Sequence, residues 1–293
     1  MDLETLKQRA KAFDYLFDAV VVTDLKGIIT DWNKGSENLY GYSRDEVVGQ
    51  PVNILHVPED TAEITAQVLA AVEEHGQWTG EIKMLHKDGF VGWIESMCVP
   101  IFDENSEMVG ALGINRDITS RKQEAERLAY LAHYDQLTGI PNRHLLFSRL
   151  NHIISQCERE QKGFAVLYID LDKFKDINDT KGHQIGDRVL VEAALRLQNS
   201  IRNSDTVARV GGDEFVLILE NIESENRALE MVKTIAKTFN KNFAIDNDEI
   251  KLSCSIGLAV YPNDGVTTET LFNVADKAMY KSKKRSLTLA KNY

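Results

Sequence analysis

Cysteine and long apolar runs are the scarcest features of this 293-residue sequence. Its three cysteines, Cys98, Cys157 and Cys254, are odd in number and widely spaced, which excludes a disulfide framework and a Cys-x-x-Cys metal site. No apolar stretch reaches the roughly 18–20 residues that a membrane-spanning helix needs, and the first residues lack the basic-then-apolar order of a signal peptide. We therefore expect a soluble, cytoplasmic chain without membrane insertion, whose cysteines are buried apolar side chains in a reducing compartment.

Composition and charge narrow the class of protein. Hydrophobic residues make up 43% and charged residues 27% of the chain, which is the balance of a folded globular protein, and the length favours two domains. Residues 1–120 hold 9 Lys and Arg against 21 Asp and Glu, whereas residues 121–293 hold 25 against 24. The acidic first part argues against nucleic-acid binding. The nearly neutral second part is compatible with a nucleotide held by local cations and a divalent metal.

The first segment has the apolar spacing of a helix from Leu3 to Phe17. Its apolar residues lie three and four apart, as in a heptad: Leu3, Leu6, Ala10, Phe13 and Phe17. The stripe packs either on its own domain or on a second copy of the chain, and two heptads are too few to decide between them.

Short strands with turn signals follow, up to about residue 117. The expected elements are strands at 19–23 and 28–32, short helical pieces between 34 and 53, a helix at 60–75, and strands at 79–86, 89–102 and 108–117. Asp24-Leu25-Lys26-Gly27 and Lys87-Asp88-Gly89 are the turn signals of two hairpins. We expect one antiparallel sheet with helices on one face.

Four short motifs make residues 10–120 resemble a PAS sensor domain. They are Val22-Thr23-Asp24-x-x-Gly27-x-Ile29 with Asp31-Trp32-Asn33, Gly41-Tyr42-Ser43-x-x-Glu46-x-x-Gly49, Lys87-Asp88-Gly89, and Gly113-x-x-Arg116-Asp117-Ile118-Thr119. The resemblance implies a five-stranded sheet whose concave side holds a ligand. It also implies that the signal leaves through Asp117-Ile118-Thr119.

The ligand of this domain is left open by the sequence. Light-sensing flavin relatives carry a reactive cysteine in the short helix after Gly41-Tyr42-Ser43, and this chain has none there. Haem would need an axial ligand, for which His56, His75 and His86 are available, although a lone histidine is more often a surface or core residue. Trp32 and Trp78 either line a flavin pocket or fill the core, and the core is the better interpretation.

A charged segment from Asp117 to about Tyr134 contains no Gly or Pro and predicts one helix. Its thin apolar seam, of Ile118, Ala125, Leu128 and Ala132, fits a parallel two-stranded stalk, and a solvated linker helix is the alternative. The predicted organisation is an N-terminal helix (1–18), a PAS domain (19–117), a linker helix (118–134) and a C-terminal domain (135–293).

The second half alternates helix and strand patterns, as an α/β sandwich does. The apolar strand 164–172 ends in Asp170 and Asp172, which a period of two places on one side of the strand. A helix is expected at 187–197, with Val189 on its apolar stripe.

A second acidic strand end follows in a hairpin. Strands at 206–210 and 215–219 flank Gly211-Gly212-Asp213-Glu214, so two acids lie at the tip beside two glycines. Hard oxygen ligands from two strand ends suit Mg²⁺, which usually takes one or two carboxylates plus substrate phosphates. The pattern predicts metal-assisted chemistry on a nucleoside triphosphate.

Residues 127–286 strongly resemble the GGDEF family of diguanylate cyclases. The motifs are Asp135-Gln136-Leu137-Thr138-Gly139-Ile140-Pro141-Asn142-Arg143, Asp170-Leu171-Asp172-x-Phe174-Lys175-x-Ile177-Asn178-Asp179, Gly182-His183-x-x-Gly186-Asp187, Arg202-Asn203-Ser204-Asp205, Gly211-Gly212-Asp213-Glu214-Phe215, Ser255-Ile256-Gly257, and Ala275-Asp276-Lys277-Ala278-Met279-Tyr280-Lys281-Ser282-Lys283. The whole chain then has an α+β fold: a PAS-type antiparallel sheet, a helical stalk and a palm-like α/β domain of the nucleotidyl cyclase type.

The resemblance implies that two GTP condense into cyclic di-GMP with release of pyrophosphate. It assigns Mg²⁺, with Mn²⁺ as an alternative, to Asp170, the Leu171 carbonyl, Asp213 and Glu214. Asp213 is the general base, although polarisation by the metal alone is an alternative. The resemblance also implies the residues that bind GTP. Lys175 and Lys283 contact the triphosphate, Asn178 and Asp187 recognise guanine, and Gly211 and Gly212 allow the nucleotide to approach the backbone closely.

Each domain binds one GTP, so the resemblance implies a homodimer regulated by the sensor and stalk. Arg202 and Asp205 match the family's Arg-x-x-Asp inhibitory site for the product. One position departs from the family pattern: Leu287 stands where an arginine is expected, so a phosphate contact is missing or is supplied by Lys284 or Arg285.

Two other classes of function are kept as alternatives. One is a catalytically silent receptor for GTP or cyclic di-GMP, against which the intact Asp170, Asp213, Glu214 and Lys175 argue. The other is a flavin or haem redox sensor in which the cyclase half is only the output.

Overall fold

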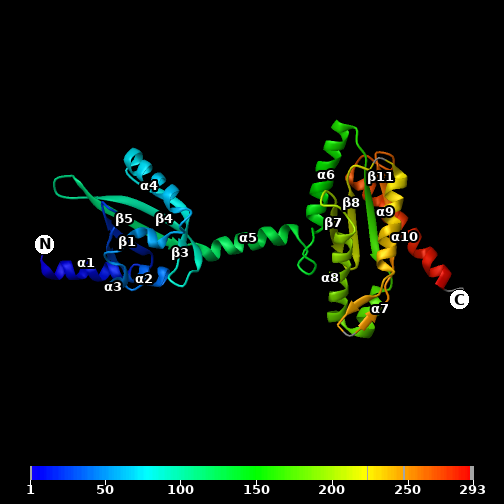
Figure 1. Cartoon of the computed structure of the whole chain (residues 1–293), viewed down its shortest axis with the longest axis horizontal. Helices are drawn as coiled ribbons and strands as arrows, with labels where there is room; N and C mark the ends of the chain where they lie inside the picture. Colours follow the sequence, from blue (N-terminus) through cyan, green and yellow to red (C-terminus); the bar gives the residue numbers. More distant parts are fainter. Residues whose placement is uncertain (1, 223, 247, 291–293) are drawn as a thin grey trace. The chain divides into compact units, whose positions relative to one another are not determined.

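The computed structural model describes residues 2–222, 224–246 and 248–290, and the chain divides into two compact units, Met1–Glu126 and Arg127–Tyr293 (Figure 1). The elements that begin in the first unit are α1 (Leu3–Tyr15), β1 (Ala19–Asp24), β2 (Ile29–Trp32), α2 (Lys34–Tyr40), α3 (Arg44–Val47), the 3₁₀ helix η1 (Val52–Leu55), α4 (Thr61–His75), β3 (Trp78–Leu85), β4 (Val91–Phe102), β5 (Met108–Asp117) and α5 (Thr119–His133). The strands form one antiparallel sheet in the order β2-β1-β5-β4-β3, as the sequence predicts.

The α1 helix ends at Tyr15, two residues before the predicted end. Leu16 is extended, and Phe17 is 95% exposed rather than part of an apolar stripe. The chain turns here because the Asn33 amide donates hydrogen bonds to the carbonyls of Phe13 (3.2 Å) and Asp18 (3.0 Å). The side chains of Leu3 and Leu6 lie outside the described part, so the partner of this helix stays a prediction.

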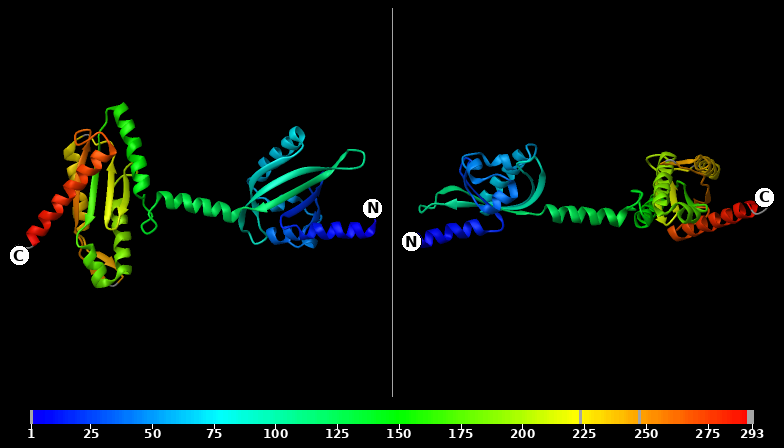
Figure 2. Two further views of the ribbon diagram at one scale, coloured as in Figure 1. Left: turned by 180° about the vertical axis from the view of Figure 1, so that it is seen from behind. Right: turned by 90° about the horizontal axis from the view of Figure 1, so that it is seen from below.

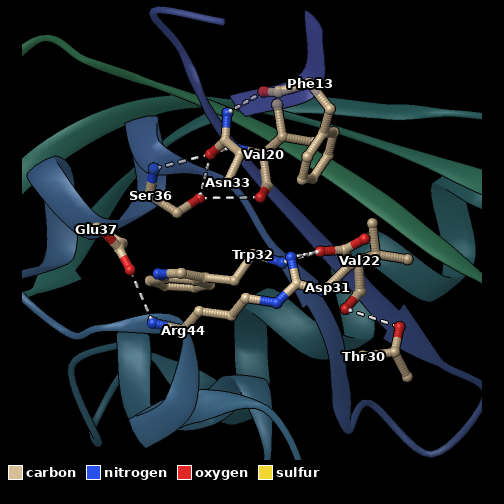
Figure 3. A network of polar contacts seen from close by, with 10 residues as sticks. All are labelled: Phe13, Val20, Val22, Thr30, Asp31, Trp32, Asn33, Ser36, Glu37 and Arg44. Atoms are coloured by element: carbon tan, nitrogen blue, oxygen red, sulfur yellow. Dashed lines mark hydrogen bonds and ion pairs between the residues drawn. The ribbon is translucent and has the colours of Figure 1, made fainter. Parts of the chain in front are cut away.

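Asn33 organises the polar core of the first unit (Figure 3). Its side-chain oxygen accepts from the backbone N–H groups of Val20 (2.9 Å) and Ser36 (2.8 Å) and so caps α2. The Ser36 hydroxyl lies 2.9 Å from the same oxygen and from the Val20 carbonyl. Asn33 and Ser36 are completely buried, and this satisfied network explains the Asp-Trp-Asn motif structurally.

The α5 helix is anchored at its start to β4. The Asp117 carboxylate accepts from the Thr119 N–H (2.8 Å), while the Thr119 hydroxyl accepts from the Trp93 N–H (2.9 Å). Arg121 and Lys122 form ion pairs with Glu81 (2.6 and 2.5 Å). These contacts of residues 117–122 with β3 and β4 therefore fix the first turn of the predicted linker helix.

The second unit is a sheet covered by helices on both faces. Its elements are α6 (Arg143–Glu160), β6 (Phe164–Leu171), α7 (Phe174–Lys181), α8 (His183–Asn199), β7 (Thr206–Gly211), β8 (Glu214–Leu219), α9 (Glu225–Phe239), β9 (Phe243–Ile245), β10 (Asp248–Ile250), β11 (Cys254–Tyr261) and α10 (Thr268–Ala290). The main sheet has the order β11-β6-β8-β7, and β9 and β10 form a separate pair.

The buried strand β6 sends alternate side chains to two hydrophobic clusters. Ala165, Leu167 and Ile169 pack toward α7, α8 and α9, whereas Val166 and Tyr168 pack toward α6 and α10. Figure 2 shows α10, in orange and red, on its side of this sheet. No helix in the described ranges is long and apolar enough to cross a membrane. The α8 helix starts at His183, four residues before the predicted helix.

Gly257 lets the α10 backbone lie directly on β11. A Cβ at this position would lie 2.0 Å from the Ala275 carbonyl oxygen and 2.3 Å from the Met279 nitrogen. Since both are backbone atoms, any larger residue must push α10, and with it Lys283, away from the sheet.

We predict that Gly257→Ala destabilises the second unit by about 1–3 kcal/mol, because it overpacks this contact. Gly211→Ala is the matched control for stability, since nothing lies within 4 Å of a Cβ there. Thermal and urea unfolding of the full chain measure the difference, and equal midpoints for the two variants would contradict the prediction.

Candidate active site

The two acidic segments meet at the end of the central strand pair. Asp170 on β6 lies directly opposite Glu214 on β8 in the antiparallel register. The Leu171 N–H donates to the Asp213 carbonyl (3.2 Å), which ties the hairpin tip to the end of β6. Acids that are separated by more than 40 residues in the sequence are therefore neighbours.

Asp170 is buried next to a single cation. It is 6% exposed, and its Oδ1 lies 2.5 Å from the Nζ of Lys283 on α10. Burial raises the pKa of Asp170, with further contributions from the charges of Asp213 and Asp172, although Lys283 acts in the opposite direction. The negative charge at this position is only partly compensated by the protein.

Glu214 is held by a tyrosine from the neighbouring strand. The Tyr168 hydroxyl donates to Glu214 Oε2 (3.0 Å). Burial raises the pKa of Glu214, and the charges of Asp170, Asp213 and Asp276 raise it further. Burial, together with the Glu214 carboxylate, also raises the pKa of Tyr168, so the tyrosine remains a proton donor in this contact.

Asp172 has a structural role that the sequence pattern does not reveal. Its two carboxylate oxygens accept from the hydroxyls of Ser253 and Ser255, each at 2.7 Å. It therefore fastens the end of β6 to β11 instead of forming a free pair with Asp170. Burial raises the pKa of the Cys254 thiol between these serines to about 12.

Arg209 supports the tip of the β7–β8 hairpin at Gly211 and Gly212. The sequence analysis did not identify this arginine. Its guanidinium donates twice to the Gly212 carbonyl (2.9 and 2.7 Å) and twice to the Asp135 carboxylate (2.9 and 3.2 Å). Gly212 has a φ of +40°, a conformation that favours glycine. Asp135 also accepts a hydrogen bond from the Thr138 hydroxyl (2.7 Å). The sequence motif that begins at Asp135 was therefore the available signal for a structural role of this carboxylate.

The predicted guanine-binding residues lie on adjoining helices. Asn178 on α7 faces Gly186 on α8 so closely that a Cβ on that glycine would lie 1.8 Å from Asn178 Oδ1. Asp187 is the next residue and is exposed, as is Lys175 at the start of α7. Asn178 therefore lies against α8 one residue before Asp187.

A cleft of about 550 Å³ opens beside Asp172 and Lys283. Lys173, Lys181 and Lys251 also line it, whereas Lys175 does not. A lysine-rich wall beside the carboxylates is suited to a polyanionic ligand. The side chains of Arg285 and Leu287 lie outside the described part. The structure therefore does not test whether the phosphate contact expected from an arginine at position 287 is lost.

The carboxylates fit a divalent cation that shares its ligands with a substrate. Across the described side chains, no three His, Cys, Asp or Glu residues form a metal-binding group by themselves. The raised pKa values of Asp170 and Glu214 nevertheless mark uncompensated negative charge, which a cation relieves. Mg²⁺ usually takes one or two carboxylate ligands from the protein and further oxygen ligands from the substrate phosphates.

The predicted product-binding residues lie on a separate surface of the domain. Asp205 accepts from the backbone N–H groups of Arg202 (3.1 Å) and Glu220 (3.0 Å), so it fixes the loop before β7. Arg202 is exposed. A shallow cleft lined by Arg149, Asp205 and Glu220 adjoins this loop.

A central antiparallel sheet carries acids at one end of two adjacent strands, and comparison with known proteins identifies the family of this domain. Residues 132–287 match the family described as diguanylate cyclase, GGDEF domain, and residues 29–115 match the PAS fold. The chain therefore belongs to the GGDEF family and carries a PAS domain before its GGDEF domain.

Several relatives are similar to parts of the chain. The bifunctional diguanylate cyclase/cyclic di-GMP phosphodiesterase MucR of Pseudomonas aeruginosa is 44% identical over 165 residues, which are 56% of this chain and 24% of MucR. The solved GGDEF domain of TpbB from the same organism is 38% identical, with a TM-score of 0.51, and the match covers 52% of this chain and 90% of that one. A solved PAS domain of a Colwellia psychrerythraea protein is 74% identical, with a TM-score of 0.39, over 40% of this chain and 99% of that one. The chain spans about a quarter to two fifths of the length of the first curated relatives.

We predict that Glu214→Gln stabilises the metal-free protein at neutral pH. Because the pKa of Glu214 is raised in the folded state, its ionised form opposes folding at every pH above that pKa. The amide keeps an acceptor for Tyr168 and removes the charge. We expect a gain of about 1–3 °C in the unfolding midpoint at pH 7–8, a modest value because the site is partly exposed.

The difference should shrink as pH falls through the raised folded pKa of Glu214 and disappear below the unfolded value of about 4.5. Calorimetry in the presence of a chelator checks this. Glu230→Gln, at an exposed residue paired with Arg227, is the control. A midpoint difference that does not change with pH would refute the electrostatic explanation.

Proposed function

We propose that this chain is a diguanylate cyclase, which condenses two GTP into cyclic di-GMP and pyrophosphate. The observation that carries the proposal is the pairing of Asp170 with Glu214 beside Asp213, with Lys283 within 2.5 Å of Asp170. Membership of the GGDEF family and relatives named diguanylate cyclases support it. Such relatives generally use divalent metals, and we propose Mg²⁺ here.

We propose that Asp170, Asp213, Glu214 and the Leu171 carbonyl hold the metal, with Mn²⁺ as an alternative ion. When bound, a divalent cation neutralises phosphate charge and makes the α-phosphorus more electrophilic. Tyr168 and the Leu171–Asp213 backbone hydrogen bond keep the acids in place before substrate arrives.

The chain's own residues bind, orient and deprotonate the substrate in this proposal. Lys283 and Lys175 meet the triphosphate, and Asn178 and Asp187 read guanine, whose N1–H and amino group donate to a carboxylate. Asp213 takes the proton of the attacking 3′-hydroxyl while the new oxygen–phosphorus bond forms and the bond to pyrophosphate breaks. Gly211 and Gly212 allow the nucleotide to approach the backbone.

A homodimer completes the reaction because each domain offers one set of GTP-binding residues. The predicted seam supports this in part: Ala125 and Ala132 are exposed and Leu128 is 57% exposed, so they have apolar groups to offer to a second copy, whereas Ile118 is buried. The sensor domain then regulates how often the two half-sites meet.

We expect purified full-length protein to convert GTP to cyclic di-GMP when Mg²⁺ is added. Asp213→Asn should lower the rate by about 100-fold or more, because it removes the proposed base and one metal ligand. Chromatography of the product measures both rates, and Glu230→Gln serves as the control. Equal rates for Asp213→Asn and wild type would defeat the assignment, and no product from any variant would favour the silent-receptor alternative.

Product inhibition is proposed to act through Arg202 and Asp205. Arg202→Ala should keep the initial rate and weaken inhibition by added cyclic di-GMP about ten-fold or more, since a charge-assisted contact is lost. Arg227→Ala, at another exposed arginine, is the matched control. Unchanged inhibition in Arg202→Ala would remove this site from the proposal.

A further inference from the structure

The cleft of about 550 Å³ in the second unit carries more positive charge than the proposed function uses. Lysines from three segments line it: Lys173 and Lys181 from the two ends of α7, Lys251 from the segment before β11, and Lys283 from α10. Asp172 and Asp176 are the carboxylates of the same lining. A concave surface with an excess of ammonium groups attracts anions.

Two of the four lysines already pair with acids of the protein. Lys181 lies 2.8 Å from a carboxylate oxygen of Asp248, and Lys283 lies 2.5 Å from Oδ1 of Asp170. The charge that these two lysines offer to a ligand is therefore partly neutralised before any ligand arrives.

Lys173 and Lys251 are the two lysines of the cleft without an acidic partner. Both are exposed, and among the described residues neither ammonium group forms an ion pair or a hydrogen bond. Asp176, in the first turn of α7, does not pair with either of them. The two ammonium groups are therefore free to bind a polyanion that enters the cleft.

The backbone at Lys173 has a conformation that is uncommon for a residue with a side chain. Its φ is +59°, in the left-handed region that favours glycine. Lys173 separates Asp172 from α7, and no side chain caps the start of that helix. The uncapped N–H groups of the first turn add a partial positive charge to that of the lysine. Lys173 and the start of α7 thus favour an anion at the same end of the cleft.

Lys283 connects the cleft to the acids of the proposed metal site. It lines the cleft, and its Nζ contacts Asp170. A GTP whose α-phosphate lies at Asp170 and Asp213 can therefore extend past Lys283 and place its terminal phosphate in the cleft. This step rests on the proposed function, which supplies GTP as the substrate and the acids as the position of its α-phosphate.

We propose that Lys173 and Lys251 bind the γ-phosphate of GTP, in addition to Lys175 and Lys283, and make the site selective for a nucleoside triphosphate. Neither residue belongs to the motifs that carry the family resemblance. Lys173 occupies the variable position of Asp-Leu-Asp-x-Phe, and Lys251 lies before the Ser-Ile-Gly motif. The β-phosphate separates the γ-phosphate from the bond that breaks, so these lysines act on binding rather than on the chemical step.

Binding of inorganic pyrophosphate to the full chain in the presence of Mg²⁺ tests the proposal without turnover. Pyrophosphate carries the terminal phosphate group, and calorimetry measures its affinity. Lys251→Gln and Lys173→Gln should each weaken binding about five-fold or more, because each removes a charge-assisted contact and keeps most of the side-chain length. Lys237→Gln, at an exposed lysine of α9 outside the cleft, is the matched control. Wild-type affinity in both cleft variants would overturn the proposal.

Three further measurements separate phosphate binding from a general disturbance of the site. Lys251→Arg should keep the affinity for pyrophosphate within about two-fold of wild type, since it retains the charge. Asp176→Asn should raise that affinity, since it removes a negative charge from the same lining. The affinity for GDP, which lacks the γ-phosphate, should be the same in wild type and in both glutamine variants. An equal loss of affinity for GDP and for pyrophosphate would contradict the assignment.

Steady-state kinetics distinguish failure of this inference from failure of the proposed function. Lys251→Gln and Lys173→Gln should raise KM for GTP about five-fold or more with little change in kcat, because they remove binding that is equal in the ground state and the transition state. A lower kcat at an unchanged KM would overturn the inference while the cyclase activity stands. Weaker pyrophosphate binding by these variants of a chain that makes no cyclic di-GMP would overturn the proposed function and support the phosphate site.

Discussion

The second unit is built around an electrostatic conflict. Antiparallel pairing of β6 and β8 puts the carboxylates of Asp170 and Glu214 directly opposite each other, an arrangement that is unfavourable for like charges. Lys283 compensates part of it, and Tyr168 gives Glu214 one hydrogen bond. The hydrophobic clusters on both faces of the sheet maintain this register against the repulsion, so stability elsewhere in the domain supports the charge density at the site.

This conflict explains why so many contacts around the acids are to the backbone. The Leu171 N–H holds the Asp213 carbonyl, and Arg209 holds the Gly212 carbonyl, so the tip cannot relax away from β6. Asp172 fastens the other side of β6 to two serines. The bonds to the Asp213 and Gly212 carbonyls fix the chain that carries the acids, whereas Asp172 acts through two serine hydroxyls.

The sequence predicted the positions of the acids better than their individual roles. The period of two in β6 and the glycine-rich tip are local signals, and they correctly brought Asp170 and the Asp213–Glu214 segment to one edge. The role of Asp172 depends on the register with β11, and Arg209 acts through Asp135, more than 70 residues away. Pairings of this kind are tertiary, so a local pattern such as the motif that begins at Asp135 marks one partner without revealing the other.

The first unit shows the same division between local and tertiary information. The turn signals and strand alternation predicted one antiparallel sheet, which the structure confirms, whereas the strand order was not predicted. The early end of α1 was not predictable from spacing, because it depends on the distant Asn33 amide.

The linker helix is fixed at both ends by side chains that bond to backbone. At its start, Asp117 caps the Thr119 N–H, and Thr119 bonds to Trp93. At its end, the Asn142 amide donates to the Leu131 and Ala132 carbonyls, while Asn142 also caps α6. A displacement of one end of the helix would be lost if the terminal turns frayed. Capped ends keep those turns helical, so that the displacement is transmitted to the residues they contact.

Beyond the end of the linker helix, the contacts continue without interruption to the tip of the β7–β8 hairpin. The Asn142 N–H bonds to the His133 carbonyl, and the Arg209 N–H bonds to the Pro141 carbonyl, which joins β7 to the segment after α5. Arg209 then holds Asp135 with one side of its guanidinium and Gly212 with the other. The last turn of α5 and the glycines beside Asp213 are thus joined by a continuous series of hydrogen bonds that passes through Arg209.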